Sequence, residues 1–310
     1  MTDIVITEFM DEAVVEGLRA KYRVHHDPGL FGKPDEIARL IANVPALIVR
    51  NQTQVRGSLL AAGAKLKVIG RLGVGLDNID MPTCEARGIK VYPATGANSL
   101  SVVEYVIGTA MTLLRGAYFA NAAMLAGTFP KTDLIGREIS GKRMGLVGFG
   151  LIARDTAAMA RAVGMEVVAH DPFVKPGDPS WGATQAVDLD ALLATSDVIS
   201  IHLPLSEGTR GLIGESAFAR MKPDAILINA ARGGVMSEAA LVAALKAGRL
   251  GGAALDVFAQ EPLGPEAAKL FADTPNLILT PHIAGNTVES NGRVSSLVAE
   301  RVVAVLEGRS

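Results

Sequence analysis

The chain has 310 residues, more than a typical single domain, so we expect two domains. Its 30 basic and 32 acidic side chains give a net charge of -2 at pH 7, and this balance argues against a nucleic-acid-binding protein. The one cysteine, Cys84, excludes an intrachain disulfide and a four-cysteine zinc site.

The sequence also bounds where the protein works. No apolar run approaches the roughly 18 residues that a membrane-spanning helix requires. The first residues lack the basic region and apolar core of a signal peptide. We therefore expect a cytoplasmic protein without a membrane partner.

Short β-rich runs alternate with helical patterns along the whole chain. The predicted strands are Asp3–Thr7, Arg23–His26, Ala46–Arg50, Leu66–Gly70, Lys90–Tyr92, Arg143–Phe149, Glu166–His170, Val198–His202, Ala225–Asn229, Gly252–Asp256 and Leu277–Thr280. Helical stretches lie between most of them, such as Ser237–Leu250, which begins with Ser237 as a predicted N-cap. Strands that are apolar throughout and alternate with helices are typical of parallel sheets covered on both faces. The sequence therefore predicts an α/β fold with two doubly wound parallel-sheet domains.

The domain boundary is predicted from a helix start near residue 98. Ser101 and Glu104 have the spacing of a capping box, and a largely apolar helix follows to about Leu114. We place a nucleotide-binding domain at residues 98–285. Residues 286–310 form another helix, which we expect to fold back onto residues 1–97 to complete the first domain.

A glycine-rich turn predicts a dinucleotide site. Arg143–Ala153 matches the pattern G-x-G-x-x-G/A, in which Gly148 permits the tight turn, Gly150 lets main-chain amides approach a pyrophosphate and Ala153 keeps the helix close to the strand. Such a triplet alone is a weak signal, because glycines also serve ordinary turns. Asp171 strengthens it, because a carboxylate directly after the next strand accepts hydrogen bonds from both ribose hydroxyls and repels a 2′-phosphate. The glycine-rich turn and Asp171 together favour NAD over NADP as the cofactor.

Three segments of the second half carry polar residues directly after buried strands, where doubly wound sheets bind their ligands. They contain Arg232, Glu261 and His282. Reduction of a 2-oxo acid needs a cation for the carboxylate, an acid for the developing alkoxide, and a group that tunes this acid. Arg232 suits the first role through two parallel hydrogen bonds, and His282 suits the second. Glu261 suits the third, since a carboxylate beside imidazole favours the protonated ring near neutral pH.

Each of these three residues also has a plainer interpretation. Arg232 could be a surface charge, Glu261 a loop residue before a proline, and His282 a turn residue after one. Their occurrence on three successive strand ends favours the catalytic interpretation over three separate coincidences.

At these residues the chain resembles the D-isomer-specific 2-hydroxyacid dehydrogenases, over essentially its whole length. The resemblance is carried by Arg71–Asp80, Gly148–Ala153, His202–Leu205 with Thr209, Asn229–Gly234, Ala254–Phe258, Glu261-Pro262 and Pro281-His282. It implies a Rossmann NAD-binding domain inserted into a flavodoxin-like substrate domain, and a homodimer built on the NAD-binding domain. It also implies that Arg232, Glu261 and His282 are catalytic.

The resemblance further implies the ligand contacts. For the cofactor these are Gly148, Gly150, Leu151, Ile152, Ala153, Asp171, His202, Leu203, Pro204, Thr209, Ala230, Ala231, Arg232, Asp256, His282, Ala284 and Gly285. For the substrate they are Arg50, Leu72, Gly73, Val74, Gly75, Arg232 and His282. Main-chain amides at Val74 and Gly75 would hold the substrate carboxylate opposite Arg232, and Asp256 would reach the nicotinamide amide. No metal is implied.

Three positions bear on how closely the chain follows the family. Leu151 stands where a charged or hydroxyl residue is frequent, so one pyrophosphate contact would be missing. Leu72 stands where a small residue is common, which would reshape the substrate entrance. Glu261 stands where formate dehydrogenases of this fold have glutamine, which argues against formate.

The substrate is left open among short acids. Arg50-Asn51-Gln52-Thr53 resembles the Arg-Ser-x-Thr loop of phosphoglycerate dehydrogenases, and Gly96–Ser101 is similar to that branch too. Arg50 would bind a C3 anion, although an arginine pointing into solvent fits equally well. The candidates are 3-phosphoglycerate, 3-sulfolactate, and glyoxylate or hydroxypyruvate. Control through a carboxyl-terminal regulatory domain, as in longer phosphoglycerate dehydrogenases, is not expected.

Two interpretations from other classes compete with the enzyme. One is an NAD-sensing scaffold, because transcriptional corepressors share this fold and the three catalytic residues; turnover of short 2-hydroxy acids would separate the two. The other is a Rossmann protein with unrelated chemistry, which predicts that Arg232 and His282 lie apart.

Overall fold

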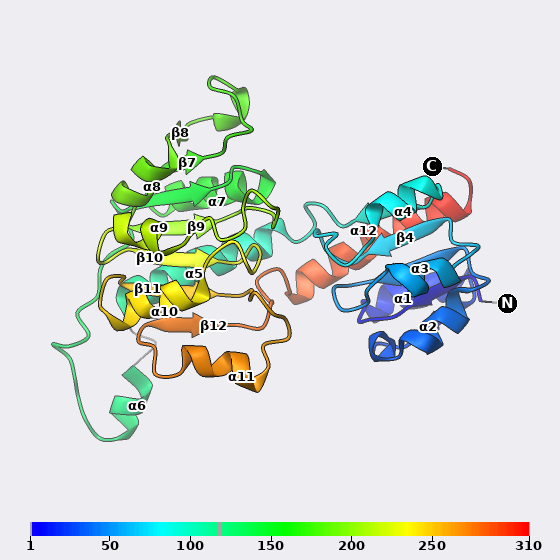
Figure 1. Ribbon diagram of the computed structural model, residues 1–310, viewed down its shortest axis with the longest axis horizontal. Coiled ribbons are helices and arrows are strands. Elements are labelled where there is room, and N and C mark those ends of the chain that lie inside the picture. Colours follow the sequence, from blue (N-terminus) through cyan, green and yellow to red (C-terminus); the bar gives the residue numbers. More distant parts are fainter. Residues whose placement is uncertain (1, 117–119, 310) are drawn as a thin grey trace. The chain divides into compact units, whose positions relative to one another are not determined.

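The computed structural model describes residues 2–116 and 120–309. The chain forms two compact units: unit 1 is Met1–Asn98 with Asn286–Ser310, and unit 2 is Ser99–Gly285. Each unit contains one parallel sheet with helices on both faces, so the predicted α/β fold class is confirmed (Figure 1). Among the described residues, no helix combines the length and apolar character that a bilayer span requires.

Unit 1 is built on a five-stranded sheet with the order β2-β1-β3-β4-β5. Its strands are β1 (Ile4–Ile6), β2 (Val24–His26), β3 (Ala46–Val49), β4 (Val68–Arg71) and β5 (Lys90–Pro93). Its helices are α1 (Glu12–Arg19), η1 (Leu30–Gly32), α2 (Pro34–Ile41), α3 (Gly57–Ala62), α4 (Met81–Ala86) and α12 (Val288–Leu306). This strand order is that of the flavodoxin-like fold, as the resemblance implied.

The three inner strands of unit 1, β1, β3 and β4, are buried because helices cover them on both sides. On one face α1 and α12 contribute Val15 and Val298 to a core that also holds Ile48. On the other face α2 and α3 contribute Ile37 and Leu60 to a second core. Both faces of the inner strands are therefore closed to water, as expected of a parallel sheet.

Unit 2 is built on a seven-stranded parallel sheet with the order β12-β11-β10-β9-β6-β7-β8. Its strands are β6 (Arg143–Val147), β7 (Glu166–His170), β8 (Gln185–Ala186), β9 (Val198–Ile201), β10 (Ile226–Asn229), β11 (Gly252–Leu255) and β12 (Leu277–Leu279). Its helices are α5 (Ser99–Arg115), α6 (Ala120–Leu125), α7 (Leu151–Ala162), η3 (Pro179–Trp181), α8 (Leu189–Thr195), α9 (Glu215–Arg220), α10 (Glu238–Lys246), α11 (Pro265–Ala268) and η4 (Lys269–Phe271). The strand order reverses between β6 and β9, which is the point where doubly wound sheets bind nucleotides.

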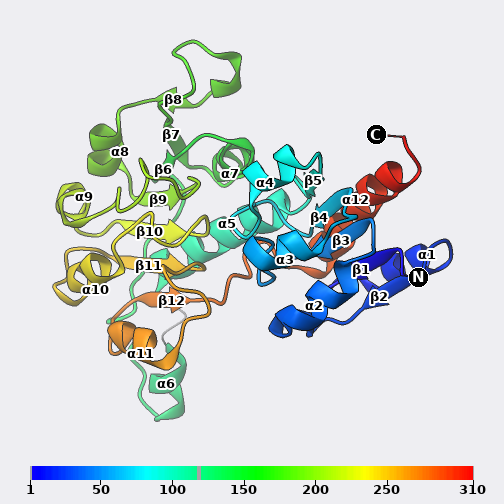
Figure 2. The ribbon, with the colours of Figure 1, turned by 45° about the vertical axis from the view of Figure 1, so that its right-hand side comes forward.

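Two layers of helices enclose this sheet. Helices α5 and α7 pack on one face, whereas α8, α9 and α10 pack on the other (Figure 2). All strands run in the same direction, so the carboxyl ends of β6, β7, β9, β10, β11 and β12 meet at one edge of the sheet. Every predicted cofactor and catalytic residue of unit 2 belongs to the segments that follow these ends.

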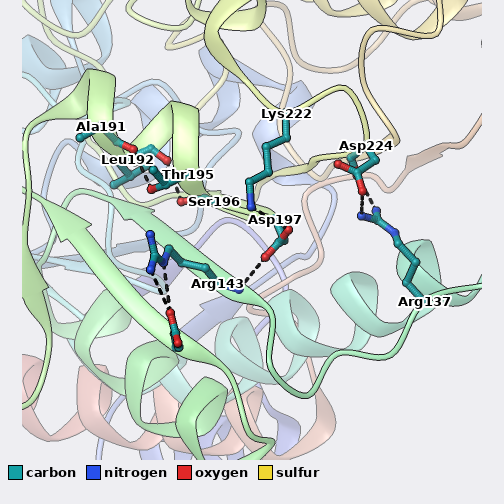
Figure 3. Close-up of polar contacts among 10 residues, drawn as sticks. Arg137, Arg143, Ala191, Leu192, Thr195, Ser196, Asp197, Lys222 and Asp224 are labelled. Carbon is teal, nitrogen blue, oxygen red and sulfur yellow. Dashed lines mark hydrogen bonds and ion pairs between the residues drawn. The ribbon is translucent and has the colours of Figure 1, made fainter.

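The opposite, amino edge of the sheet is held by ion pairs. Asp197 precedes β9, and its carboxylate accepts a hydrogen bond from the main-chain N–H of Arg143 at 2.8 Å and contacts Lys222 Nζ at 3.0 Å (Figure 3). Burial pushes the pKa of Asp197 upward, but these two partners outweigh it and the pKa is lowered. Figure 3 also shows Arg137 paired with Asp224 nearby. Since this edge lies away from the ligand-binding ends, we regard the network as structural.

Local predictions differ from the structure in two places. The predicted capping box at Ser101 and Glu104 is wrong. Helix α5 begins at Ser99, so Ser101 already lies within the helix, and its side chain is buried. Strand β8 was not predicted, because two exposed residues carry no apolar pattern. The N-cap at Ser237 is confirmed, since its hydroxyl accepts the N–H of Ala240 at 3.3 Å.

Candidate active site

The glycine-rich turn joins β6 to α7 in unit 2. Gly148 has a φ of +94°, and a Cβ there would lie 2.6 Å from the carbonyl oxygen of His202, so only glycine fits this close approach. Gly150 is the N-cap of α7, is exposed and has open space where a Cβ would be. Ala153 is fully buried against the sheet. The unpaired N–H groups at this helix start suit an anion such as a pyrophosphate.

Asp171 lies beside this turn, directly after β7. Its Oδ2 accepts the main-chain N–H of Phe149 at 2.8 Å, and its Oδ1 accepts that of Phe173 at 2.9 Å. Each carboxylate oxygen accepts about two hydrogen bonds, so both oxygens retain capacity for a ribose hydroxyl. The residues present therefore fit an adenine dinucleotide, with a carboxylate where the extra phosphate of NADP would stand.

The segment after β9 closes a turn beside the glycine-rich turn. The Thr209 hydroxyl donates to the Pro204 carbonyl at 2.7 Å and accepts the N–H of Ser206 at 2.8 Å. The Nε2 atom of His202 is buried with no hydrogen-bond partner among the described residues. Burial lowers the pKa of His202 to about 4, so its ring is neutral near neutral pH. The predicted contacts Leu203 and Leu151 are half-buried and exposed, respectively.

The loop after β10 positions Arg232. Asn229 accepts the N–H of Ala231 and donates to the carbonyl of Arg232, which closes a short side-chain turn. A Cβ on the next residue, Gly233, would lie 1.7 Å from the carbonyl oxygen of Phe258. Only glycine therefore lets this loop pack against the loop that carries Glu261.

Glu261 and His282 form the central pair of the site. Oε2 of Glu261 accepts from Nδ1 of His282 at 2.7 Å, and Oε1 accepts the N–H of Phe258 at 3.0 Å. Burial raises the pKa of Glu261, but the bond to His282, the Phe258 N–H and the charges of His282 and Arg232 outweigh it, so the pKa is lowered. The guanidinium of Arg232 is thus close enough to act on Glu261. The side chains of His282 and Glu261 keep 37% and 29% of their accessible surface, so the pair is open to a ligand.

Asp256 organises the loop that carries His282. Its Oδ1 accepts from the Thr280 hydroxyl at 2.6 Å and from the N–H of Ile283 at 2.8 Å, and its Oδ2 accepts the N–H of Ala284 at 2.7 Å. Oδ2 keeps capacity for one further donor, such as the predicted amide. Burial raises the pKa of Asp256, which the hydroxyl and the two N–H groups offset only in part.

The other predicted cofactor positions lie on the same strand ends. Ala230 and Ala231 follow β10, Ala284 is buried, and Gly285 ends unit 2. Ile152 stands in the first turn of α7. Among residues 2–116 and 120–309, no group of three or more His, Cys, Asp or Glu side chains is arranged to hold a metal ion.

In unit 1 the loop that carries Arg50 is held by hydrogen bonds. The carboxylate of Glu8, 3% exposed, accepts main-chain N–H groups of Arg50, Gln52 and Thr53 at 2.8 to 3.0 Å. The Arg50 guanidinium donates to Asn286 and Asn291, at 3.1 Å each, and lies 5.8 Å from the centre of the Phe9 ring. Arg50 therefore does not extend freely into solvent, and whether it meets the substrate stays a prediction.

The predicted substrate loop of unit 1 follows β4. Gly73 is buried, whereas Val74 and Gly75 are half-buried. The side chain of Leu72 is 2% exposed and packs in the core with Ile48. The side chain of Leu72 is thus used in packing, and a contact of its main chain with the substrate stays a prediction.

Sequence reasoning missed several residues that shape these sites. The Arg50 loop is contacted by Glu8, Asn286 and Asn291. Asp256 is contacted directly by Thr280, which in turn contacts Tyr105. Thr280 stood beside the motif Pro281-His282 and was within reach of sequence reasoning. Tyr105 lies 175 positions from its partner, and no local pattern marks it.

The chain is similar to known proteins in sequence and in fold. Residues 107–284 match the family model of the D-isomer specific 2-hydroxyacid dehydrogenase NAD binding domain. The chain is 49% identical over 306 residues to a protein named (S)-sulfolactate dehydrogenase from Chromohalobacter salexigens, with 97% of each chain covered. It is 39% identical to the D-3-phosphoglycerate dehydrogenase of Archaeoglobus fulgidus, covering 88% of this chain and 52% of that one.

The fold also matches solved structures along the whole chain. One is D-lactate dehydrogenase from Aquifex aeolicus complexed with NAD and lactic acid, with a TM-score of 0.85, 26% identity, and coverage of 99% of this chain and 96% of that one. Another is the TT0316 protein from Thermus thermophilus, with a TM-score of 0.90, 30% identity, and 99% and 98% coverage. The chain belongs to the D-isomer specific 2-hydroxyacid dehydrogenase family and is an NAD-dependent oxidoreductase that acts on a small 2-hydroxy acid.

Proposed function

We propose that Arg232, Glu261 and His282 of unit 2 carry this reaction. When bound, NAD exchanges a hydride with the C2 carbon of the acid. The observation that supports the assignment most directly is the 2.7 Å bond between His282 Nδ1 and Glu261 Oε2 at the ligand-binding edge of the sheet. Arg232 lies close enough to lower the pKa of the same carboxyl group.

His282 exchanges the proton of the C2 oxygen. Because Nδ1 is bonded to the Glu261 carboxylate, Nε2 is the ring nitrogen that meets the substrate. In reduction the imidazolium donates its Nε2 proton to the oxygen as negative charge develops there. In oxidation the neutral ring removes the hydroxyl proton.

Arg232 holds the substrate carboxylate. Its guanidinium presents five N–H donors in a planar fork, which matches the two oxygens of a carboxylate. The turn at Asn229 and the close packing at Gly233 fix the backbone from which this side chain extends. The acid is thereby oriented before the chemical step, which reduces its entropic cost.

Replacing Glu261 with glutamine should reduce kcat by about five- to twentyfold. The carboxylate accepts a charged hydrogen bond from His282 Nδ1 and so orients the ring, whereas the neutral amide offers only a weaker bond. The measurement is kcat with NAD and excess substrate. Glu266→Gln, on the exposed helix α11, serves as the control. A kcat equal to that of the wild type would show that Glu261 does not support His282 in this way.

Replacing Asp171 with alanine should narrow the preference for NAD over NADP by about ten- to a hundredfold. The carboxylate offers charged hydrogen bonds to the ribose, each worth roughly 1.5–3 kcal/mol, and repels a 2′-phosphate. The ratio of kcat/KM for the two cofactors measures the change. Asp171→Asn keeps an acceptor for the N–H of Phe149 and separates charge from turn geometry. An unaltered ratio would mean that another group reads the ribose.

For the substrate we propose a short 2-hydroxy acid with an anionic group at C3, of the 3-sulfolactate type. The relative with 49% identity is named (S)-sulfolactate dehydrogenase, and this match covers 97% of both chains. Arg50 supplies a cation that Phe9, Asn286 and Asn291 hold in one place. Relatives named D-3-phosphoglycerate dehydrogenase and hydroxypyruvate reductase support phosphoglycerate and hydroxypyruvate as alternatives.

Purified enzyme assayed with NAD against sulfolactate, phosphoglycerate, glycerate, malate and lactate tests the substrate proposal. Arg50→Ala should reduce kcat/KM by about ten- to a hundredfold on acids with a C3 anion and leave glycerate nearly unchanged. Arg23→Ala, at the exposed pair with Asp3, is the matched control. Equal losses on all acids would show that Arg50 does not select the substrate. Absence of turnover with every acid would favour the NAD-sensing scaffold.

We further propose that the enzyme is a homodimer built on unit 2. Large apolar side chains are exposed around α6, a helix that lies outside the two helix layers of its unit: Met124, Leu125, Phe129 and Ile135. A group of exposed apolar side chains often marks an interaction surface. Light scattering should show the mass of a dimer for the wild type and for the control Val288→Glu, and a lower mass for Leu125→Glu. A cytoplasmic location stays a prediction.

A further inference from the structure

A chain of three hydroxyl and carboxylate groups runs from helix α5 to the loop of His282. Tyr105 on α5 contacts the Thr280 hydroxyl at 2.6 Å, and Thr280 donates to Asp256 Oδ1 at 2.6 Å. We propose that Tyr105 is a positioning residue for catalysis, which holds His282 in place through Thr280 and Asp256. This inference rests on the proposed role of His282.

The direction of the hydrogen bonds follows from the chemistry of the groups. Thr280 has one hydroxyl proton, and the ionised carboxylate of Asp256 only accepts. The Thr280 proton is therefore committed to Asp256, and the Tyr105 hydroxyl must donate to Thr280 Oγ1. Burial raises the pKa of Tyr105 to about 12, so this hydroxyl keeps its proton throughout the working range of pH. Chained donors of this kind strengthen one another in a medium of low polarity.

Asp256 holds the main chain at His282 and at the two residues that follow it. Its carboxylate accepts the N–H groups of Ile283 and Ala284, and its carbonyl oxygen accepts the N–H of His282 at 2.8 Å. His282 has a φ of +57°, a left-handed conformation that costs a non-glycine residue free energy. The conformation persists because these hydrogen bonds hold it. A loss of order at Asp256 would let the ring drift from its reactive position.

Helix α5, which carries Tyr105, is anchored in the core of unit 2. It has 17 residues, and Val103, Val106 and Ile107 on its inner face are buried in the core of unit 2. The ring of Tyr105 packs against the same core, so its hydroxyl has a fixed position. Tyr105 thereby couples the short loop after β12 to a helix that is buried in the core of unit 2.

The role proposed for Tyr105 differs from ordinary stabilisation. The hydroxyl of Tyr105 meets this loop at Thr280, so its loss should leave ligand binding intact and slow the step that depends on the orientation of His282. Small displacements of a reacting group reduce rates steeply. An effect on the chemical step with unchanged binding separates this role from a general loosening of the fold.

The first measurement compares wild type with Tyr105→Phe, which removes one hydroxyl and keeps the ring. The single-turnover rate of NADH oxidation should fall about three- to tenfold, the range expected for one lost hydrogen bond of a network. The KM values for NADH and for the acid should stay within twofold. Tyr22→Phe, which loses a hydroxyl contact with Glu307 in unit 1, should match the wild type.

The second measurement is a double-mutant cycle with Thr280. Thr280→Val breaks the chain at its middle, so adding Tyr105→Phe to it should cost less than a further twofold. Thr280→Ser keeps the hydroxyl and should retain the wild-type rate and its sensitivity to Tyr105→Phe. Losses that multiply in the double variant would overturn the proposal, because Tyr105 would then act by another route. A wild-type rate for Tyr105→Phe would overturn it too.

His282→Ala in the same assay distinguishes this inference from the proposed function. If His282→Ala turns over normally, the catalytic role of His282 fails and the positioning role of Tyr105 fails with it. If His282→Ala is inactive while Tyr105→Phe equals the wild type, only the inference about Tyr105 fails. Melting temperatures of all variants check that each is folded.

Discussion

Replacement of His282 by alanine is expected to reduce kcat by about two to four orders of magnitude in both directions of the reaction. This is the usual range for the loss of a general acid and base. With the ring gone, the C2 oxygen must exchange its proton with water, while Arg232 still orients the acid. KM for the acid should therefore change far less than kcat, as expected of a residue that acts in the transition state.

The left-handed backbone at His282 calls for a second variant. Asparagine tolerates a φ near +57° better than most residues, so His282→Asn preserves the loop while removing the acid and base. Both variants should show the same loss. His25→Asn, on strand β2 of unit 1, is the control histidine and should keep full activity. Near-normal turnover by His282→Asn would end the assignment.

Replacement of Arg232 by alanine is expected to reduce kcat/KM by about two to three orders of magnitude. The reason is the loss of a charged, two-point contact with the substrate carboxylate, for which removal of one partner costs roughly 2–5 kcal/mol. Most of the effect should appear in KM for the acid, with KM for NAD nearly unchanged.

Arg232→Lys tests the geometry of this contact. Lysine keeps the charge but lacks the planar fork, so it should recover only part of the loss. Arg220→Ala, which removes an exposed side chain at the end of α9, is the control and should behave as the wild type. If Arg232→Ala raised KM for NAD and left the acid unaffected, Arg232 would belong to the cofactor site alone.

Patterns local in the chain were sufficient for the fold class and for the glycine-rich turn between β6 and α7. Apolar strands alternating with helices predicted parallel sheets, and the spacing of Gly148, Gly150 and Ala153 predicted the β6–α7 turn. Both predictions are correct because an apolar strand pattern and a glycine turn are each set by residues close together in the sequence. The failed capping box at Ser101 shows the limit of such patterns, since burial of α5 in the core outweighed a local preference.

The proposed catalytic residues were predicted from strand ends, yet their contacts arise from the arrangement of the sheet. Glu261 and His282 are 21 positions apart and meet because β11 and β12 run parallel and end together. The need for glycine at position 233 comes from the carbonyl group of Phe258, which packs against it only in the folded protein. The supporting groups, Glu8 under the Arg50 loop and Tyr105 behind Thr280, carry no sequence signal. Residue type and local spacing suffice where chemistry depends on neighbours in the chain, whereas contacts across the fold depend on how strands order and helices pack.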